Sequence, residues 1–257
     1  ARQQVGAGGE QAEAGRKLHL TPRQTMRLAQ QLYEGIELGS ETTGLITYMR
    51  TDSTQVAGEA QMLARKYIEG RWGISYLPAK PPYYRSKVAN AQEAHEAIRP
   101  TDTLRSPEQV AAFLDRQQLA LYELIWRRFI ASQMKAAIYA TTTIDIQAGS
   151  EYLFKASGST LLFPGYKAIY NEARDDEPEE QDTQLPEVSA GELLSLLQLL
   201  PEQHFTEPPP RYSEASLIKE LEKNGVGRPS TYATIIGIIK NHNYILKNKN
   251  KLNPTNI

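Results

Sequence analysis

Residues 44–54 read GLITYMRTDST, and the rest of the chain is best understood outward from this stretch. Residues 44–50 are rich in β-branched and aromatic side chains, which favours a short buried strand. Asp52 or Ser53 then offers an N-terminal cap for a helix over the apolar positions that follow. The pattern therefore predicts that Tyr48 lies near the end of a strand, just before a helix begins.

Three side chains in this stretch could carry chemistry. A phenol such as that of Tyr48 is mostly protonated at neutral pH and is then a poor nucleophile. The guanidinium of Arg50, two residues further on, would share its face of a strand, favour the phenolate and hold a phosphate through two hydrogen bonds. Asp52 continues the row and could orient Arg50. From spacing alone, an ordinary core tyrosine beside a solvated arginine remains the simpler interpretation.

The flanking sequence predicts a mixed α and β, multi-domain fold. Thr21 with Gln24 three residues later forms a capping box that opens a helix upstream of the motif. We expect a mostly helical domain over 1–134, a β-rich segment over 135–200 where apolar residues alternate at strand spacing, and a helical part over 201–257. Within the second segment, residues 175–182 form a strongly acidic loop, and the leucine-rich run 193–200 fits either a helix or a strand.

Composition excludes several classes of protein. Of 257 residues, 40% are hydrophobic and 23% charged, which is ordinary for a soluble globular protein. No apolar run is long enough to span a membrane, and the first 17 residues lack a signal core, so we expect a cytoplasmic address. Cysteine is absent, which excludes disulfides and thiol nucleophiles. The net charge of −1 predicts that any nucleic-acid site is local, and residues 240–251 are the basic stretch.

A second motif, AHEAIRPT at residues 94–101, gathers His95, Glu96 and Arg99. An imidazole can donate to a phosphate or move a proton near neutral pH. Arg99 precedes a proline, so its backbone is extended or in a turn. A hydrogen-bonded structural histidine is the simpler alternative, and the spacing offers no second histidine for a metal site.

A third motif, GVGRPST at residues 225–231, joins two predicted helices in a helix-turn-helix outline. Free amide groups at the start of the second helix favour a phosphate, Arg228 adds charge, and Ser230 and Thr231 supply hydroxyls. Simple capping between two packed helices explains the same residues equally well.

These three motifs together resemble signature regions of bacterial type IA DNA topoisomerases. The segments YEGIELGSETTGLITYMRTDST, AHEAIRPT and RYSEASLIKELEKNGVGRPSTYATIIGIIK occur in the family's order, and the likeness runs from about Lys17 to near Pro254. It implies that Tyr48 attacks a DNA phosphodiester and becomes linked to the 5′-phosphate, so that a strand can pass and religation needs no ATP. It implies that Arg50 positions that phosphate and that His95 lies near the cleavage site. The residues expected to contact DNA are Asp52, Arg99, Arg228, Ser230, Thr231 and His242.

The resemblance also carries expectations about fold, cofactor and partners. It implies a toroid in which a tyrosine-bearing helical domain is joined by β-rich arches to a base. The family binds Mg²⁺ in an N-terminal Toprim domain that we expect to lie outside this chain, and no D-x-D-x-E grouping occurs here, so we expect no metal site. We expect a monomer that acts on single-stranded or negatively supercoiled DNA in the bacterial cytoplasm, at the nucleoid. The residues before Lys17 fit the family poorly, and His242 stands where an arginine is expected.

Two other functions are alternatives to this one. Alone, the chain could act as a single-stranded DNA-binding scaffold without turnover. A tyrosine recombinase or type IB enzyme requires dispersed arginines and a C-terminal tyrosine on a helix, which the sequence does not offer.

Overall fold

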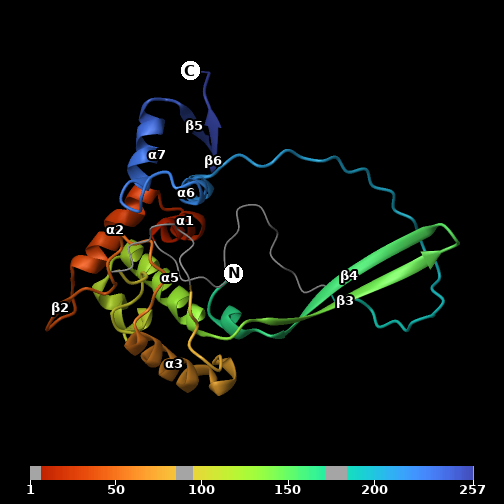
Figure 1. Ribbon diagram of the computed structural model, residues 1–257, viewed down its shortest axis with the longest axis horizontal. Helices are drawn as coiled ribbons and strands as arrows, with labels where there is room; N and C mark the ends of the chain where they lie inside the picture. Colours follow the sequence, from red (N-terminus) through yellow and green to blue (C-terminus); the bar gives the residue numbers. More distant parts are fainter. Residues whose placement is uncertain (1–6, 85–94, 172–183, 257) are drawn as a thin grey trace. The chain divides into compact units, whose positions relative to one another are not determined.

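A computed structural model of the chain describes residues 7–84, 95–171 and 184–256 (Figure 1). The predicted acidic loop at 175–182 lies outside the described residues. The chain divides into two compact units: the first comprises residues 1–136, 165–175 and 211–257, and the second 137–164 and 176–210. The mixed α and β class is confirmed, whereas the assignment of 1–134, 135–200 and 201–257 to separate domains stays a prediction.

The first unit contains all seven helices of the described residues. Their bounds are α1 Ala7–Leu18, α2 Pro22–Glu34, α3 Gly58–Trp72, α4 Pro107–Val110, α5 Arg116–Gln133, α6 Glu214–Lys223 and α7 Tyr232–Asn241. Three 3₁₀ turns, η1 Ile74–Tyr76, η2 Ala111–Phe113 and η3 Gly165–Ala168, link them. Two small antiparallel hairpins also belong to this unit: β1 Ile36–Glu37 with β2 Thr42–Thr43, and β5 Ile245–Asn248 with β6 Lys251–Pro254.

The predicted start of α2 is confirmed in atomic detail. The Gln24 amide N–H donates to the Thr21 hydroxyl at 3.2 Å, and the Thr21 N–H donates to the Gln24 carboxamide oxygen at 2.9 Å. This reciprocal pair satisfies two amides that the helix itself cannot bond. The box therefore fixes where α2 begins, and α2 carries Tyr33 to the motif of residues 44–54.

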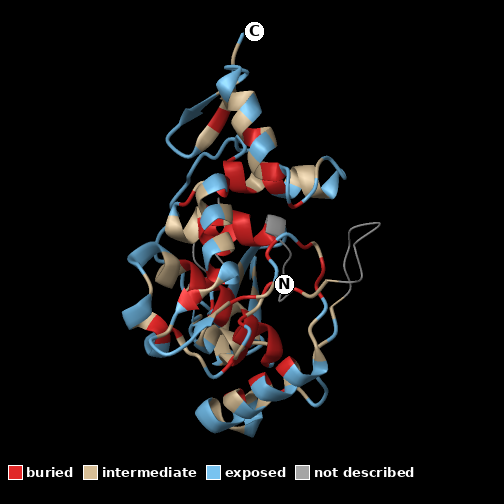
Figure 2. Cartoon of the chain, turned by 90° about the vertical axis from the view of Figure 1, so that its left-hand side faces the viewer, coloured by how far each residue is buried: buried red, intermediate tan, exposed pale blue. Residues whose placement is uncertain are grey.

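The core of the first unit is built around α5. Its inward side chains, such as Tyr122 and Phe129, are completely buried and pack against α2 residues including Leu32; Figure 2 draws the buried positions in red. The buried Tyr122 hydroxyl donates to the Arg105 carbonyl at 2.6 Å, as a buried polar group requires. This core supports the segment that carries Tyr48.

The expected strand at 44–50 is wrong. The structure gives only an isolated antiparallel bridge between Ile46 and Pro100. A proline has no N–H for a ladder, so the pairing cannot extend as a regular strand. The expected cap is also wrong, because α3 begins at Gly58 after Ala57 without a side-chain cap. The intervening residues instead turn on local bonds, such as that from the Gln55 N–H to the Ser53 hydroxyl at 3.2 Å.

The second unit is a long antiparallel hairpin, β3 Ile138–Ala148 with β4 Tyr152–Phe163, followed by the segment 184–210. The alternation at strand spacing is thus confirmed. The leucine-rich run 193–200 is neither helix nor strand, contrary to both expectations. Its leucines are exposed, Leu193 by 97%, so no apolar neighbour among the described residues stabilises regular structure there.

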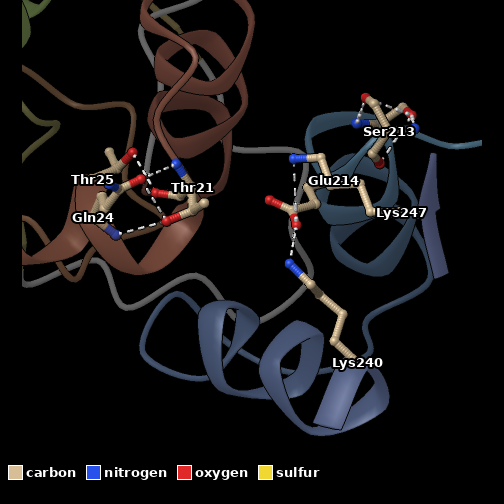
Figure 3. A network of polar contacts seen from close by, with 8 residues as sticks. Thr21, Gln24, Thr25, Ser213, Glu214, Lys240 and Lys247 are labelled. Atoms are coloured by element: carbon tan, nitrogen blue, oxygen red, sulfur yellow. Dashed lines mark hydrogen bonds and ion pairs between the residues drawn. The ribbon is translucent and has the colours of Figure 1, made fainter. Parts of the chain in front are cut away.

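The C-terminal part of the first unit is held together by a buried carboxylate. Ser213 caps α6, and Ser216 completes the capping box. Glu214, in the first turn of α6, is only 8% exposed and accepts from Lys240 of α7 at 2.8 Å, with Lys247 of β5 at 3.8 Å (Figure 3). In the same unit α6 contacts α1 and α7 contacts α2. These contacts bring the third motif close to the first.

None of the helices in the described residues is long and apolar enough to cross a bilayer.

Candidate active site

Tyr48 lies between two other rings at the surface of the first unit. Its ring centroid is 5.5 Å from that of Tyr33, which meets it edge-on, and 5.4 Å from that of His95. Tyr48 is 37% exposed, so the residue is not enclosed in the core. An exposed phenol between α2 and the second motif can be reached by a large substrate.

Thr47 joins the first and second motifs. Its hydroxyl donates to the Ala97 carbonyl at 2.8 Å and accepts from the Arg99 N–H at 3.0 Å, while its own N–H donates to the Arg99 carbonyl at 2.9 Å. The Thr101 N–H adds a bond to the Leu45 carbonyl at 3.0 Å. These bonds replace the missing strand ladder and bring His95 beside Tyr48.

Side chains alternate along the first motif even without a regular strand. Tyr48 and Arg50 are exposed, whereas Met49 and Thr51 are 1% exposed. The alternation that we expected from a strand therefore survives locally. It presents a phenol and a guanidinium to solvent two residues apart.

Arg99 is held within its own motif. Its Nε donates to the Glu96 carboxylate at 2.8 Å and its Nη1 to the Pro100 carbonyl at 2.9 Å, and its side chain is only 13% exposed. A phosphate would have to compete with Glu96 for this guanidinium. That Arg99 contacts DNA therefore stays a prediction.

The third motif forms a tight turn before α7. Gly227 has a φ of +81°, and a Cβ there would lie 2.7 Å from the Ile235 side chain. The Thr231 hydroxyl accepts from the Arg228 N–H at 2.8 Å, which closes the turn. Arg228, Ser230 and Thr231 are all exposed. The turn thus displays a cation and two hydroxyls, as the sequence predicted.

Electrostatics link this turn to Asp52 of the first motif. Burial raises the pKa of the Glu222 carboxyl on α6, and the charge of Asp52 raises it further. Burial, with the charges of Glu222 and Asp52, raises the pKa of Tyr232 to about 12, and Arg228 opposes this shift. Asp52 of the first motif is therefore close enough to α6 and α7 for its charge to act on Glu222 and Tyr232.

His242 lies apart from this group, at the opposite end of α7 from Thr231. Its ring stacks on that of Tyr244. The structure thus brings His95 beside Tyr48, and the charge of Asp52 acts on residues that flank the third motif, whereas His242 lies apart.

A divalent cation requires several oxygen ligands, which proteins usually supply as clustered carboxylates. Within residues 7–84, 95–171 and 184–256, no three His, Cys, Asp or Glu side chains gather closely enough to hold one. These residues do not fit a Mg²⁺ site, and the chemistry proposed below uses the side chains of this chain alone.

The Thr47 bonds predict a measurable loss of stability. Thr47→Val keeps the shape of the side chain but leaves the Arg99 N–H and the Ala97 carbonyl without their partner, so we expect unfolding to become easier by about 1–2 kcal/mol. Urea denaturation of the chain measures this, with Thr42→Val, an exposed strand position, as the matched control. Equal stability of the two variants would show that the Thr47 hydroxyl does not hold the motifs together.

Three contributions to the site were not predicted from the sequence. The sequence shows Thr47 only as one residue of the expected strand, and it indicates no role for Tyr33 or for Glu222. The helical spacing of apolar residues predicts that Tyr33 lies at the end of α2, and this was the one indication that it could lie beside the motif. Nothing local in the sequence indicated that Glu222 would lie near Asp52.

Known proteins were compared with the chain. The family described as DNA topoisomerase matches residues 10–257. DNA topoisomerase 1 of Rickettsia conorii is 48% identical over 245 residues, which cover 95% of this chain and 32% of the relative. DNA topoisomerase 1 of Xylella fastidiosa is 49% identical over 251 residues, covering 96% and 31%. The chain thus spans about a third of the length of these relatives.

A solved structure is similar over nearly the whole chain. Full-length topoisomerase I from Thermotoga maritima matches with a TM-score of 0.78 and 36% sequence identity, covering 98% of this chain and 40% of that one. The likeness extends to the arrangement of the elements and not only to the three motifs.

Proposed function

The chain belongs to the bacterial type IA DNA topoisomerase I family, and from this premise we propose that it carries the tyrosine that cleaves and rejoins one DNA strand. The observation that carries the proposal is the exposed Tyr48 phenol beside His95, with Arg50 two residues away. DNA is the substrate that membership of the family implies. We further propose that the complete enzyme relaxes negative supercoils by passing a strand through the break.

The proposed chemistry is a reversible transesterification. The Tyr48 oxygen attacks a backbone phosphorus, a new P–O bond forms to the phenol, and the bond from phosphorus to the 3′ oxygen breaks. The phenol loses its proton, and the leaving 3′ oxygen takes one up, so the number of phosphoester bonds is unchanged. The 3′ hydroxyl later attacks the phosphotyrosine and reverses both changes, which is why no ATP is needed.

Each neighbouring side chain has a distinct proposed role. Arg50 would neutralise the attacked phosphate and hold it in place, since a guanidinium can make two parallel bonds to it. His95 would move or hold a proton beside the Tyr48 oxygen, which an imidazole can do near neutral pH. Asp52 would orient Arg50 and border the DNA, and Arg228 with Ser230 and Thr231 would receive the strand next to the break.

The fold has a proposed place in the complete enzyme. Residues 1–134 would form the tyrosine-bearing domain, 135–200 an arch, and 201–257 part of the base of a toroid that opens to pass a strand. We propose that Mg²⁺ is held in another part of such an enzyme, because the described residues do not fit it. We expect the complete enzyme to act as a monomer at the bacterial nucleoid.

A second function applies to the chain on its own. We propose that the chain alone, which spans about a third of the length of its relatives, binds single-stranded DNA without turnover. Weak, salt-sensitive binding is expected from local positive charge on a chain of net charge −1.

Two assays test these proposals. A full-length topoisomerase that carries this chain as its segment should form an SDS-resistant adduct in which the 5′ end of a cleaved, labelled oligonucleotide is attached to Tyr48. The chain alone, given supercoiled plasmid and Mg²⁺, should leave the plasmid supercoiled. Attachment at another residue would contradict the first proposal, and relaxation by the chain alone would contradict the second.

A further inference from the structure

Two glutamates of α1, three residues apart, are buried in the first unit. Glu10 is 4% exposed and Glu13 is 3% exposed. Residues three apart are neighbours on the surface of a helix, so the two carboxyls lie on one side of α1. A buried carboxylate is tolerated only where hydrogen bonds or cations compensate its charge. The two glutamates differ in how far their surroundings supply this compensation.

The carboxyl of Glu13 is well compensated. Its Oε2 accepts from the Tyr170 hydroxyl at 2.6 Å, and its Oε1 accepts from Nη1 of Arg16 at 3.2 Å. Burial alone would raise the pKa of this carboxyl, but the charge of Arg128 and these two partners outweigh burial, and the pKa lies below its ordinary value. Glu13 is therefore ionised at neutral pH.

The carboxyl of Glu10 is poorly compensated. Its Oε1 has no hydrogen-bond partner among the described residues. Burial is the main reason why the pKa of Glu10 rises from an ordinary 4.5 to about 7. The charge of Arg128 on α5 opposes this rise in part, Glu13 adds to it, and Lys17 opposes it. An ionised Glu10 is therefore costly while α1 is docked.

The charged groups of the other helices that pack on α1 lie elsewhere. Besides α5, α1 contacts α2 and α6. The charged side chains of these two helices are Arg23, Arg27, Glu34, Glu214, Lys219, Glu220, Glu222 and Lys223. Glu214 is the buried one of this set and pairs with Lys240 and Lys247, and His19, just after α1, is exposed. The charges that act on Glu10 come instead from α5 and from α1 itself.

We infer that Glu10 is a pH-dependent switch on α1: its neutral carboxyl keeps the helix docked on α5, and its ionised carboxylate releases the helix. Arg128 joins the two helices when they are docked, because its Nη1 donates to the Gly9 carbonyl at 3.5 Å. Release returns the Glu10 charge to water, where it needs no partner. A carboxyl whose pKa is raised in the docked state stabilises docking below its ordinary 4.5, and this stabilisation is lost as the pH rises through about 7.

The switch does not depend on the chemistry proposed for Tyr48. It would nevertheless affect the elements around the candidate site, since α1 contacts α2, which carries Tyr33, and α6, which precedes the third motif. Release of α1 at high pH is therefore expected to loosen both helices as well.

Hydrogen exchange of the α1 amides, measured on the whole chain at about pH 5.5 and about pH 8.5, tests the switch. After division by the intrinsic exchange rates, the equilibrium constant for opening of α1 should rise by about 30-fold between these pH values in the wild type. This is the rise expected for a carboxyl whose pKa falls from about 7 to 4.5 on release. Glu10→Gln keeps the shape of the neutral carboxyl but cannot ionise, so it should show no such rise.

Glu13→Gln is the matched control, because it lies in the same cluster but has a lowered pKa. Glu13 is ionised at both pH values whether α1 is docked or released, so its loss should speed exchange by a similar factor at both. This variant should also keep most of the wild-type rise. If the wild type and Glu10→Gln showed equal rises, the inference would be overturned.

A direct titration of the wild-type chain guards against a variant that fails to fold. The ¹³C chemical shift of the Glu10 carboxyl should change with a midpoint near pH 7. A midpoint below about pH 5, the range of an ordinary glutamate, would equally overturn the inference. Either negative result leaves the proposed function to be decided by the adduct assay on Tyr48.

Discussion

Tyr48→Phe, in a full-length topoisomerase that carries this chain as its segment, is expected to abolish the covalent adduct with DNA. The substitution removes only the phenol oxygen, which is the atom proposed to attack phosphorus. The ring that packs 5.5 Å from Tyr33 and 5.4 Å from His95 stays in place. Affinity for single-stranded DNA should therefore remain within about twofold of the wild type, as for other mild surface changes.

The adduct is measured as a labelled oligonucleotide that migrates with the protein after SDS denaturation, and affinity by titration of the same oligonucleotide. Tyr33→Phe is the matched control, because it removes a phenol oxygen from the neighbouring ring of the same stack and should leave the adduct intact. A labelled adduct that persists in Tyr48→Phe would exclude Tyr48 as the nucleophile. Loss in both variants would point instead to damage of the aromatic stack.

Local sequence rules predicted those parts of the fold that local bonds decide. The α2 start follows from Thr21 and Gln24 alone, and the β3–β4 hairpin from alternation along a single segment. Residues 44–50 carried an equally clear strand pattern that failed, since Pro100 opposes Ile46 and cannot continue a ladder. Hydrogen bonds of the Thr47 side chain join the two segments instead, and no local sequence pattern predicts such bonds.

The candidate site residues also divide into those that a local motif indicates and those that only the fold brings together. Tyr48 and His95 could be named from motifs, but their contact depends on hydrogen bonds between residues about 50 positions apart in sequence. The neighbourhood of Asp52 with Glu222 and Tyr232 depends on the packing of α6 and α7 in the first unit, which spacing could not indicate.

At Gly44 the backbone of the first motif packs directly against the end of α2. A Cβ at this position would lie 2.4 Å from the carbonyl oxygen of Tyr33, a distance that real Cβ atoms do not reach. The next residue, Leu45, donates its N–H to the Leu32 carbonyl at 2.7 Å, and the Gly44 carbonyl accepts from the Thr101 hydroxyl at 2.7 Å. The segment is therefore bonded on both sides, and neither backbone can move aside without breaking a bond.

Gly44→Ala is accordingly expected to destabilise the chain by about 3 kcal/mol, at the upper end of the cost of overpacking. It should also reduce adduct formation by Tyr48, because the shift separates the end of α2 from the motif and with it Tyr33 from Tyr48. Chemical denaturation measures the first effect as a lower midpoint at unchanged slope. Gly70→Ala, inside α3 with open space around the new methyl, is the control and should be neutral or stabilising by up to about 1 kcal/mol. If the two variants were equally stable, α2 and the motif would lie further apart than this 2.4 Å approach implies. The contact between Tyr33 and Tyr48 would then lose its structural basis.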